Sequence, residues 1–89
     1  APAIDEPCPD VAAETVAANR SGQWSRVLDL TRSSRCWDDP VARSSLRMNA
    51  LLELGRYAEC TELGATLTHP EARRLAKRCA KQLEKKGAP

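Results

Sequence analysis

Residues 54–63 read LGRYAECTEL, and residues 21–30, 33 positions earlier, read SGQWSRVLDL. Both copies place a glycine two residues before an aromatic side chain, Tyr57 in one copy and Trp24 in the other. Since glycine readily takes the left-handed conformation that ends many helices, each copy predicts a turn between two helices. An internal repeat of this length is typical of helical hairpins that stack on one another.

Apolar periodicity extends the helical interpretation to the rest of the chain. Trp24, Val27, Leu28 and Thr31 recur at the i, i+3, i+4, i+7 spacing of an amphipathic helix, and no segment alternates with the period of a strand. We therefore predict an all-α fold. The expected helices are a first one from Pro9 or Asp10 to the stop at 19–22, followed by Gln23–Ser34, Pro40–Leu54, Arg56–Thr66 and Pro70–Lys85.

Two of these helix starts carry capping residues. Asp39 is placed to accept hydrogen bonds from the free N–H groups of the third helix, and Pro40 fits its first turn. Thr68-x-x-Glu71 matches a capping box for the fifth helix. The expected domain organisation is an extended tail or linker at 1–7, a helical domain at 8–86 and a disordered end at 87–89.

Segment 52–60 resembles the tetratricopeptide repeat (TPR), whose turn carries a glycine, an aromatic two residues later and a small residue three further on. Gly55, Tyr57 and Cys60 occupy these positions, and residues 22–27 match more loosely. The resemblance implies two TPR-like helical hairpins plus a C-terminal capping helix in a right-handed stack. Because the first helix of each hairpin departs from the family pattern, a generic right-handed stack of hairpins stays an alternative.

The four cysteines are too far apart for a Cys-x-x-Cys motif, which argues against a zinc site or a thioredoxin-like pair. A chain of 89 residues has a marginal core, and small chains of this kind use disulfides in oxidising compartments. We therefore expect an extracytoplasmic location, periplasmic or secreted. Reduced cysteines buried in a cytosolic protein and a four-cysteine metal site are the alternatives.

Helix geometry selects the pairing of the cysteines, because residues of an antiparallel hairpin lie side by side when they are equally far from its turn. Cys8 and Cys36 lie about 13 and 14 residues from the first turn, and Cys60 and Cys79 about nine and ten from the last. Pairing Cys36 with Cys60 leaves a mismatch of about 20 Å at 1.5 Å per residue. We predict the disulfides Cys8–Cys36 and Cys60–Cys79.

Charge is divided unevenly along the chain. Residues 1–70 carry seven Arg and ten acidic side chains (net −3), whereas residues 71–89 carry seven Lys and Arg and two Glu (net +5). A basic helix of this kind is often only a solvated face, but it also serves anionic polymers or lipid head groups, which we keep as an alternative function. Nucleic acid is not expected, because the helix has no aromatic side chain to stack on bases. The basic face comprises Arg73, Arg74, Lys77, Arg78 and Lys81.

The sequence contains no motif that indicates catalysis. Its single histidine, His69, lies in the turn beside Pro70, where we expect it to be solvated or to cap the helix. Bridged cysteines leave no thiolate nucleophile, so we predict no catalytic residues, no cofactor and no metal. The apolar runs reach three residues, far below the roughly 20 that a membrane span requires, and no span is expected.

The TPR resemblance places the binding surface on the first helix of each hairpin, which lines the concave side of such a stack. The partner implied is a protein or an extended peptide, with a structural assembly spacer as a further alternative. Carboxylate binding of the kind found in some family members is not expected, because only Asn49 is suitably placed. The implied groove residues are Ala12, Val16, Asn19, Ser45, Asn49, Leu52 and Glu53.

The wider context of the chain is an expectation from composition and resemblance. Ten Arg against four Lys is typical of GC-rich bacterial genes, and the missing initiator Met and leader favour a mature segment. Cysteine-bearing TPR pairs resemble the extracytoplasmic region of some bacterial Ser/Thr protein kinases. We therefore expect a noncatalytic scaffold or sensor module of an exported bacterial protein, attached to a larger chain.

Overall fold

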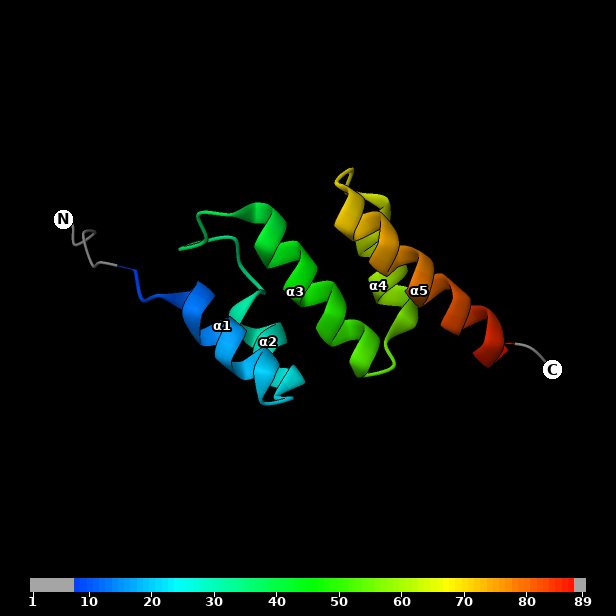
Figure 1. Cartoon of the computed structure of the whole chain (residues 1–89), viewed down its shortest axis with the longest axis horizontal. Helices are drawn as coiled ribbons and strands as arrows, with labels where there is room; N and C mark the ends of the chain where they lie inside the picture. The colour runs from blue at the N-terminus through cyan, green and yellow to red at the C-terminus, as the bar shows by residue number, and fades with distance from the viewer. Residues whose placement is uncertain (1–7, 88–89) are drawn as a thin grey trace.

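The structure, a computed structural model, describes residues 8–87, so the predicted tail at 1–7 and residues 88–89 lie outside the described part. No strand occurs within the described residues, which confirms the all-α prediction. The helices are α1 (Val11–Arg20), α2 (Trp24–Leu30), α3 (Pro40–Glu53), α4 (Tyr57–Ala65) and α5 (Pro70–Gly87) (Figure 1).

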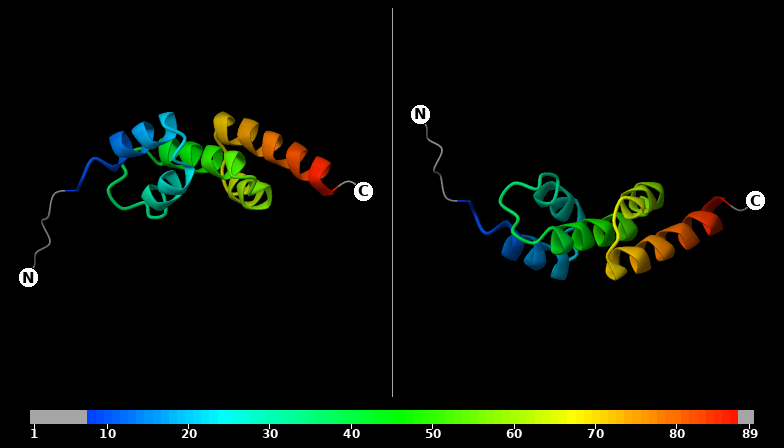
Figure 2. Two further views of the ribbon diagram at one scale, coloured as in Figure 1. Left: turned by 90° about the horizontal axis from the view of Figure 1, so that it is seen from below. Right: turned by 90° about the horizontal axis from the view of Figure 1, so that it is seen from above.

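Helix α3 is the centre of the arrangement. It packs against the other four helices, while α1 pairs with α2 and α4 pairs with α5. Helices α1 and α5 lie on one side of α3, and α2 and α4 lie on the other (Figure 2). Among the described elements, α1 and α5 both contact α3 but do not pack against each other. Helix α3 is therefore partly uncovered between them.

Glycines form the turns that the repeat predicts. Gly22 and Gly55 have φ angles of +71° and +76°, in the left-handed region that glycine adopts without steric cost. The next helix begins two residues later in each case, at Trp24 and Tyr57, and both aromatic rings pack against the core. The two turns are thus confirmed at the predicted positions.

Side chains of aspartate start two of the helices. Asp10 Oδ1 accepts a hydrogen bond from the backbone N–H of Ala13 at 3.1 Å, so α1 begins at Val11. Asp39 Oδ1 accepts from two N–H groups of the first turn of α3, at 3.0 and 3.1 Å, as the Asp39-Pro40 pair predicts. Both carboxylates satisfy donors that have no partner inside the helix.

Helix α2 is shorter than predicted, since it ends at Leu30 and not at Ser34. The carbonyl of Thr31, which a continued helix would use, accepts instead from Nε of Arg43 at 2.9 Å. Residues 31–39 consequently form an irregular loop between α2 and α3. The helix therefore ends at a contact with Arg43, twelve residues further along the chain than Thr31. The sequence pattern of residues 23–34 gives no indication of this contact.

Helix α5 differs from prediction at both ends. Its first turn is capped by His69, whose Nδ1 accepts from the N–H of Ala72 at 3.2 Å, and not by the predicted Thr68 capping box. It continues to Gly87, so the helix includes the first residue of the segment predicted as a disordered end. Of the two roles considered for His69, capping is the one observed.

The core lies along α3 and extends into both neighbouring helix pairs. Met48 and Leu51 of α3 are almost fully buried, and Val27 packs against them from α2. Gly64 of α4 lies so close to α5 that a Cβ at this position would be 2.6 Å from Cβ of Ala76. The close packing of α4 against α5 therefore requires a residue without a side chain.

Candidate functional site

A groove lies over α3 between α1 and α5, on the side that faces the viewer in Figure 1. Its volume of about 570 Å³ is within the range of ligand sites in proteins. Helix α3 forms the floor, and α1 and α5 form the two walls. The lining residues are Val16 and Asn19 of α1, Ala42, Ser45, Leu46 and Asn49 of α3, and Glu71, Leu75 and Arg78 of α5.

Two asparagines join the floor of the groove to the α1 wall. Nδ2 of Asn49 donates to Oδ1 of Asn19 at 3.1 Å, and both residues are half-buried. A carboxamide has two N–H donors and an oxygen with two lone pairs, so this bond uses only part of each side chain. Oδ1 of Asn49 therefore remains a free acceptor, and Nδ2 of Asn19 remains a free donor. The hydrogen bond between the two side chains keeps these groups close together.

Ser45 lies one helical turn before Asn49 on the floor of the groove. Its residue exposure is 8%, and its Oγ has no hydrogen-bond partner among the described residues. Leaving a buried hydroxyl without a partner costs about 1–3 kcal/mol, and such groups are uncommon in folded proteins. The groove thus contains a pair of partly used amides, while the Oγ of Ser45 beneath its surface is closed to solvent.

The α5 wall combines one apolar side chain with two opposite charges. Glu71, Leu75 and Arg78 follow one another at i, i+4 and i+7, so they share one face of the helix. Seven residues of helix separate Glu71 from Arg78 by about 10 Å along its axis. Val16, 38% exposed, adds apolar surface on the opposite wall.

Four of the seven predicted groove residues line the groove, and three do not. Ala12 lines a separate hollow at the Cys8–Cys36 disulfide. Leu52 belongs to the core, because it follows Met48 by four residues and lies on the buried face of α3. Glu53 is exposed at the end of α3. The four that line it are Val16, Asn19, Ser45 and Asn49.

Five lining residues were missed by the sequence interpretation. Ala42, Ser45, Leu46 and Asn49 recur at i, i+3, i+4 and i+7 along α3. The sequence pattern alone therefore indicates that Ala42 and Leu46 share the side of the helix that carries Ser45 and Asn49. The three residues of α5 were missed because α5 was assigned the role of a capping helix, and a cap is not expected to form a groove wall.

The residues of the predicted basic face border different hollows of α5. Arg78 lines the groove, whereas Lys77 and Lys81 line a shallow depression elsewhere on α5. Arg73 and Arg74 are exposed. Arg74, Lys77, Arg78 and Lys81 recur at i, i+3, i+4 and i+7, so these four lie on one side of the helix.

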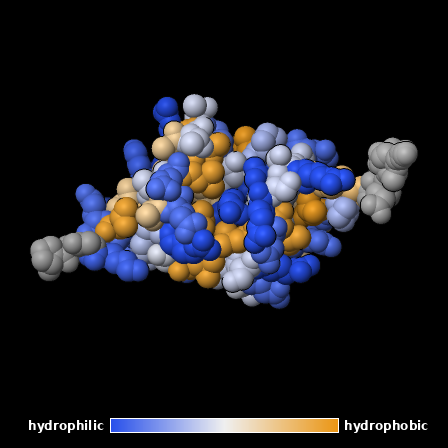
Figure 3. All heavy atoms as spheres, turned by 180° about the vertical axis from the view of Figure 1, so that it is seen from behind, coloured by the Kyte–Doolittle hydropathy of each residue, from blue (hydrophilic) through white to orange (hydrophobic). Residues whose placement is uncertain are grey.

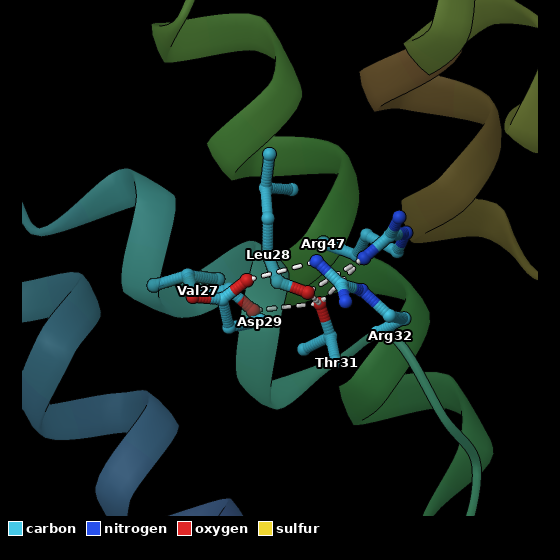
Figure 4. A network of polar contacts seen from close by, with 6 residues as sticks. All are labelled: Val27, Leu28, Asp29, Thr31, Arg32 and Arg47. Carbon is cyan, nitrogen blue, oxygen red and sulfur yellow. Dashed lines mark hydrogen bonds and ion pairs between the residues drawn. The ribbon is translucent and has the colours of Figure 1, made fainter.

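On the opposite side of α3 from the groove, arginines hold the C-terminal end of α2. Nη1 of Arg47 donates to the carbonyl of Leu28 at 2.9 Å and to Oγ1 of Thr31 at 3.2 Å (Figure 4). Arg43 donates to the carbonyls of Thr31, Arg32 and Ser33. The last carbonyls of a helix lack internal partners and carry partial negative charge, so guanidinium groups stabilise this short helix.

The surroundings of Arg47 affect its ionisation. Burial lowers the pKa of Arg47 from its ordinary value, and the nearby charges of Arg43 and Arg56 lower it further, while Glu59 opposes this change. An arginine side chain keeps its charge in proteins, so the bonds to α2 are charge-assisted. The face on which α2 and α4 lie shows hydrophilic residues between hydrophobic patches (Figure 3).

Two disulfides link the pairs expected from the sequence, Cys8–Cys36 and Cys60–Cys79, with Cα–Cα distances of 5.4 and 6.1 Å. Cys60 and Cys79 are both 0% exposed between α4 and α5, whereas Cys8 is exposed and Cys36 is half-buried. Cys36 lies in the loop after α2, which returns it to the N-terminal end of α1. The two bonds thus occupy contrasting environments.

Two kinds of feature are absent from the described residues, namely a metal-ligand cluster and a membrane-spanning helix. Within 8–87, no group of three or more His, Cys, Asp or Glu side chains is close enough together to hold a metal ion. None of the helices described has the length and apolar character needed to cross a bilayer. Nε2 of His69 is buried without a partner in this part of the chain, while its Nδ1 caps α5.

Comparison of the chain with family models, with curated proteins and with solved structures found no match in any of the three.

Proposed function

We propose that this protein is a noncatalytic interaction module that binds an extended segment of a partner protein in the groove between α1 and α5. The observation that carries the proposal is the Asn19–Asn49 amide pair, which leaves one free acceptor and one free donor in the groove. A ligand that pairs with both groups gains two hydrogen bonds, each contributing about 0.5–1.5 kcal/mol.

The chemistry of these two side chains fits a peptide backbone. A peptide unit has one N–H donor and one C=O acceptor. Asn49 supplies a matching acceptor and Asn19 a matching donor. Backbone recognition of this kind binds extended segments of varied sequence, and the walls then determine which side chains are preferred.

The α5 wall favours a charge pattern in the bound segment. Glu71 and Arg78 are about 10 Å apart along the helix. A segment in the polyproline II conformation advances about 3.1 Å per residue and presents every third side chain on the same face, so residues three positions apart are separated by about 9 Å. We infer a preferred segment with a basic residue against Glu71, an acidic residue three positions away against Arg78, and apolar contact with Leu75 between them.

A TPR-like stack supplies the framework for this proposal. Consecutive helices pack against each other along the whole chain, and α3 also packs against α1 and α5, as expected when repeated hairpins stack. Together with the 33-residue repeat, this packing supports two TPR-like hairpins capped by α5 in a right-handed stack. The first helices, α1 and α3, then contribute to one binding surface.

The two disulfides are consistent with an oxidising, extracytoplasmic location, because such bonds form and persist there. We propose a periplasmic or secreted module of a bacterial protein. Its attachment to a larger chain, such as the outer part of a Ser/Thr kinase, is part of the same proposal and is supported by the resemblance of segment 52–60.

Panning of displayed random 12-residue peptides against the oxidised protein tests the proposed function. We expect enriched peptides to bind with micromolar Kd, and Asn49→Ala to weaken that binding about tenfold, the effect of losing one or two hydrogen bonds. Gln82→Ala, an amide truncated at an exposed position of α5, serves as the matched control and leaves binding unchanged. Failure to enrich any peptide that depends on Asn49 contradicts the proposal.

Binding measurements on the same protein also distinguish peptide binding from the alternative function, which is binding of an anionic polymer or lipid head group. The +5 charge of residues 71–89 favours binding of an anionic polymer such as heparin. Such binding falls steeply with salt and weakens in Lys77→Gln or Lys81→Gln variants, but not in Asn49→Ala. A structural spacer binds neither the enriched peptides nor heparin.

A further inference from the structure

The Cys8–Cys36 disulfide lies open to solvent at the N-terminal end of the molecule. Both cysteines line a hollow of about 410 Å³ formed by the start of α1, the loop 31–39 and the start of α3. The hollow is large enough to admit an attacking thiol. Cys60–Cys79, in contrast, is fully buried between two helices.

The backbone at Cys36 is strained. Its φ angle is +70°, and it is the one residue other than glycine with a positive φ among those described. A side chain with a Cβ is disfavoured in this region, and such residues persist only where their surroundings enforce the conformation. Opening the disulfide removes that constraint, which favours reduction of this bond.

The hollow is strongly acidic. Asp10, Asp38 and Asp39 line it together with the two cysteines, and all three are exposed. The N-terminal ends of α1 and α3 supply about +0.5 charge each, and no Lys or Arg is among the described residues that line the hollow. The charge of the lining therefore stays negative, which repels the thiolate of an anionic molecule relative to that of a neutral or cationic one.

We propose that Cys8–Cys36 is a thiol–disulfide exchange site, selective for dithiol reductants with neutral or positive surroundings. A thiolate of the reductant attacks Sγ of the exposed Cys8 and forms a mixed disulfide, while Cys36 leaves as a thiolate and takes up a proton. The second thiol of the reductant then displaces Cys8. The protein gains two electrons and two protons, and the reductant is oxidised to its own disulfide.

The loop keeps other attachments when this bond opens. Nε1 of Trp37 donates to the carbonyl of Leu30 at 3.0 Å, and Arg43 holds the carbonyls of residues 31–33. The two thiols therefore remain near each other, and oxidation restores the bond. The site is a reversible one, and Cys60–Cys79 stays closed throughout.

Reduction of the folded protein by dithiothreitol at 15 °C, with timed alkylation and peptide mapping by mass spectrometry, tests the accessibility of each bond. We expect alkylation at Cys8 and Cys36 at least about tenfold faster than at Cys60 and Cys79, since a buried bond reacts only after local opening. Re-oxidation should restore the original mass. Opening of both bonds at the same rate would overturn the proposal.

Charge selectivity is tested with three small thiols on the same two-carbon frame, compared at equal thiolate concentration. Cationic cysteamine should open Cys8–Cys36 about tenfold faster than anionic 2-mercaptoethanesulfonate at low salt, with neutral 2-mercaptoethanol between them and the difference narrowed at 1 M salt. Asp38→Asn should reduce this ratio about twofold, whereas Glu62→Gln, an exposed acid on α4, should not change it. Equal rates for the three thiols contradict the proposed selectivity.

Discussion

The two ends of the molecule are stabilised by different physical means. The N-terminal pair, α1 and α2, adds polar contacts with α3 to the apolar packing of Val27, with hydrogen bonds from Arg43 and Arg47 to the α2 end and from Asn49 to α1. Its disulfide is open to solvent. The C-terminal pair, α4 and α5, packs so closely that Gly64 is required, and its disulfide is part of the core.

Loop-closure entropy does not distinguish the two disulfides. With sequence separations of 28 and 19 residues, it gives about 3.6 and 3.2 kcal/mol, a difference smaller than the uncertainty of the relation. The native environment therefore decides which bond matters more. Burial adds packing to the contribution of Cys60–Cys79, and backbone strain at Cys36 subtracts from the contribution of Cys8–Cys36.

The largest expected effect is removal of the buried bond. The double variant Cys60→Ala, Cys79→Ala should lose about 4 kcal/mol, because loop entropy and buried sulfur contacts are lost together. Since a domain of this size has a total stability near 5 kcal/mol, the variant should be largely unfolded at 37 °C. Circular dichroism during thermal unfolding measures this, and a Tm close to that of the parent protein would contradict the account.

A smaller loss is expected from removal of the exposed bond. Cys8→Ala, Cys36→Ala should lose about 2 kcal/mol, since relief of the strained backbone offsets part of the entropy term. Replacing Cys36 by glycine in this background should recover up to about 1 kcal/mol if the loop keeps its native conformation. Urea unfolding gives both values, and a loss equal to that of the buried pair would remove the contrast between the two ends.

The packing of the C-terminal pair is tested by adding one methyl group. Gly64→Ala should destabilise the protein by about 1–2 kcal/mol, because the new Cβ meets Ala76 at 2.6 Å and the gain in helix propensity offsets only part of the cost. Ala65→Gly, at the exposed neighbouring position in α4, is the control for propensity alone. Stabilisation by Gly64→Ala would show that α4 and α5 are less tightly packed than described.

The smallest change in stability is expected from a substitution in the groove, where removal of a side-chain group should stabilise the protein. Ser45→Ala removes a buried hydroxyl that has no partner, so it should stabilise the free protein by up to about 1 kcal/mol. It should leave the Kd of a groove peptide within about twofold of the parent value, because the Oγ of Ser45 is closed to solvent. Chemical unfolding measures the stability and calorimetric titration the Kd, and a destabilised variant would show that the hydroxyl has a hydrogen-bond partner.

Features determined by neighbouring residues could be predicted from the sequence. Asp39-Pro40 starts a helix, and Gly22 and Gly55 form turns, through interactions within a few residues. Both disulfide pairs predicted from distances to the turns are confirmed, although Cys8 and Cys36 lie outside α1 and α2.

Features determined by distant contacts could not be predicted in this way. The early end of α2 depends on Arg43, which is twelve residues further along the chain than Thr31. The burial of Leu52 depends on which face of α3 turns inward, and the α5 wall depends on how the last helix crosses α3. Periodicity identifies a face of a helix but not the neighbour that covers it.

The central claim is that the groove between the two ends binds an extended peptide, and ¹⁵N NMR of the oxidised protein tests it most directly. On titration with a peptide enriched by panning, we predict that the side-chain amide signals of Asn19 and Asn49 and the backbone signal of Ser45 shift together, while signals of Lys77, Lys81 and Glu84, which line a separate depression on α5, change least. Shifts confined to those three α5 residues, with the asparagine amides unchanged, would contradict the claim.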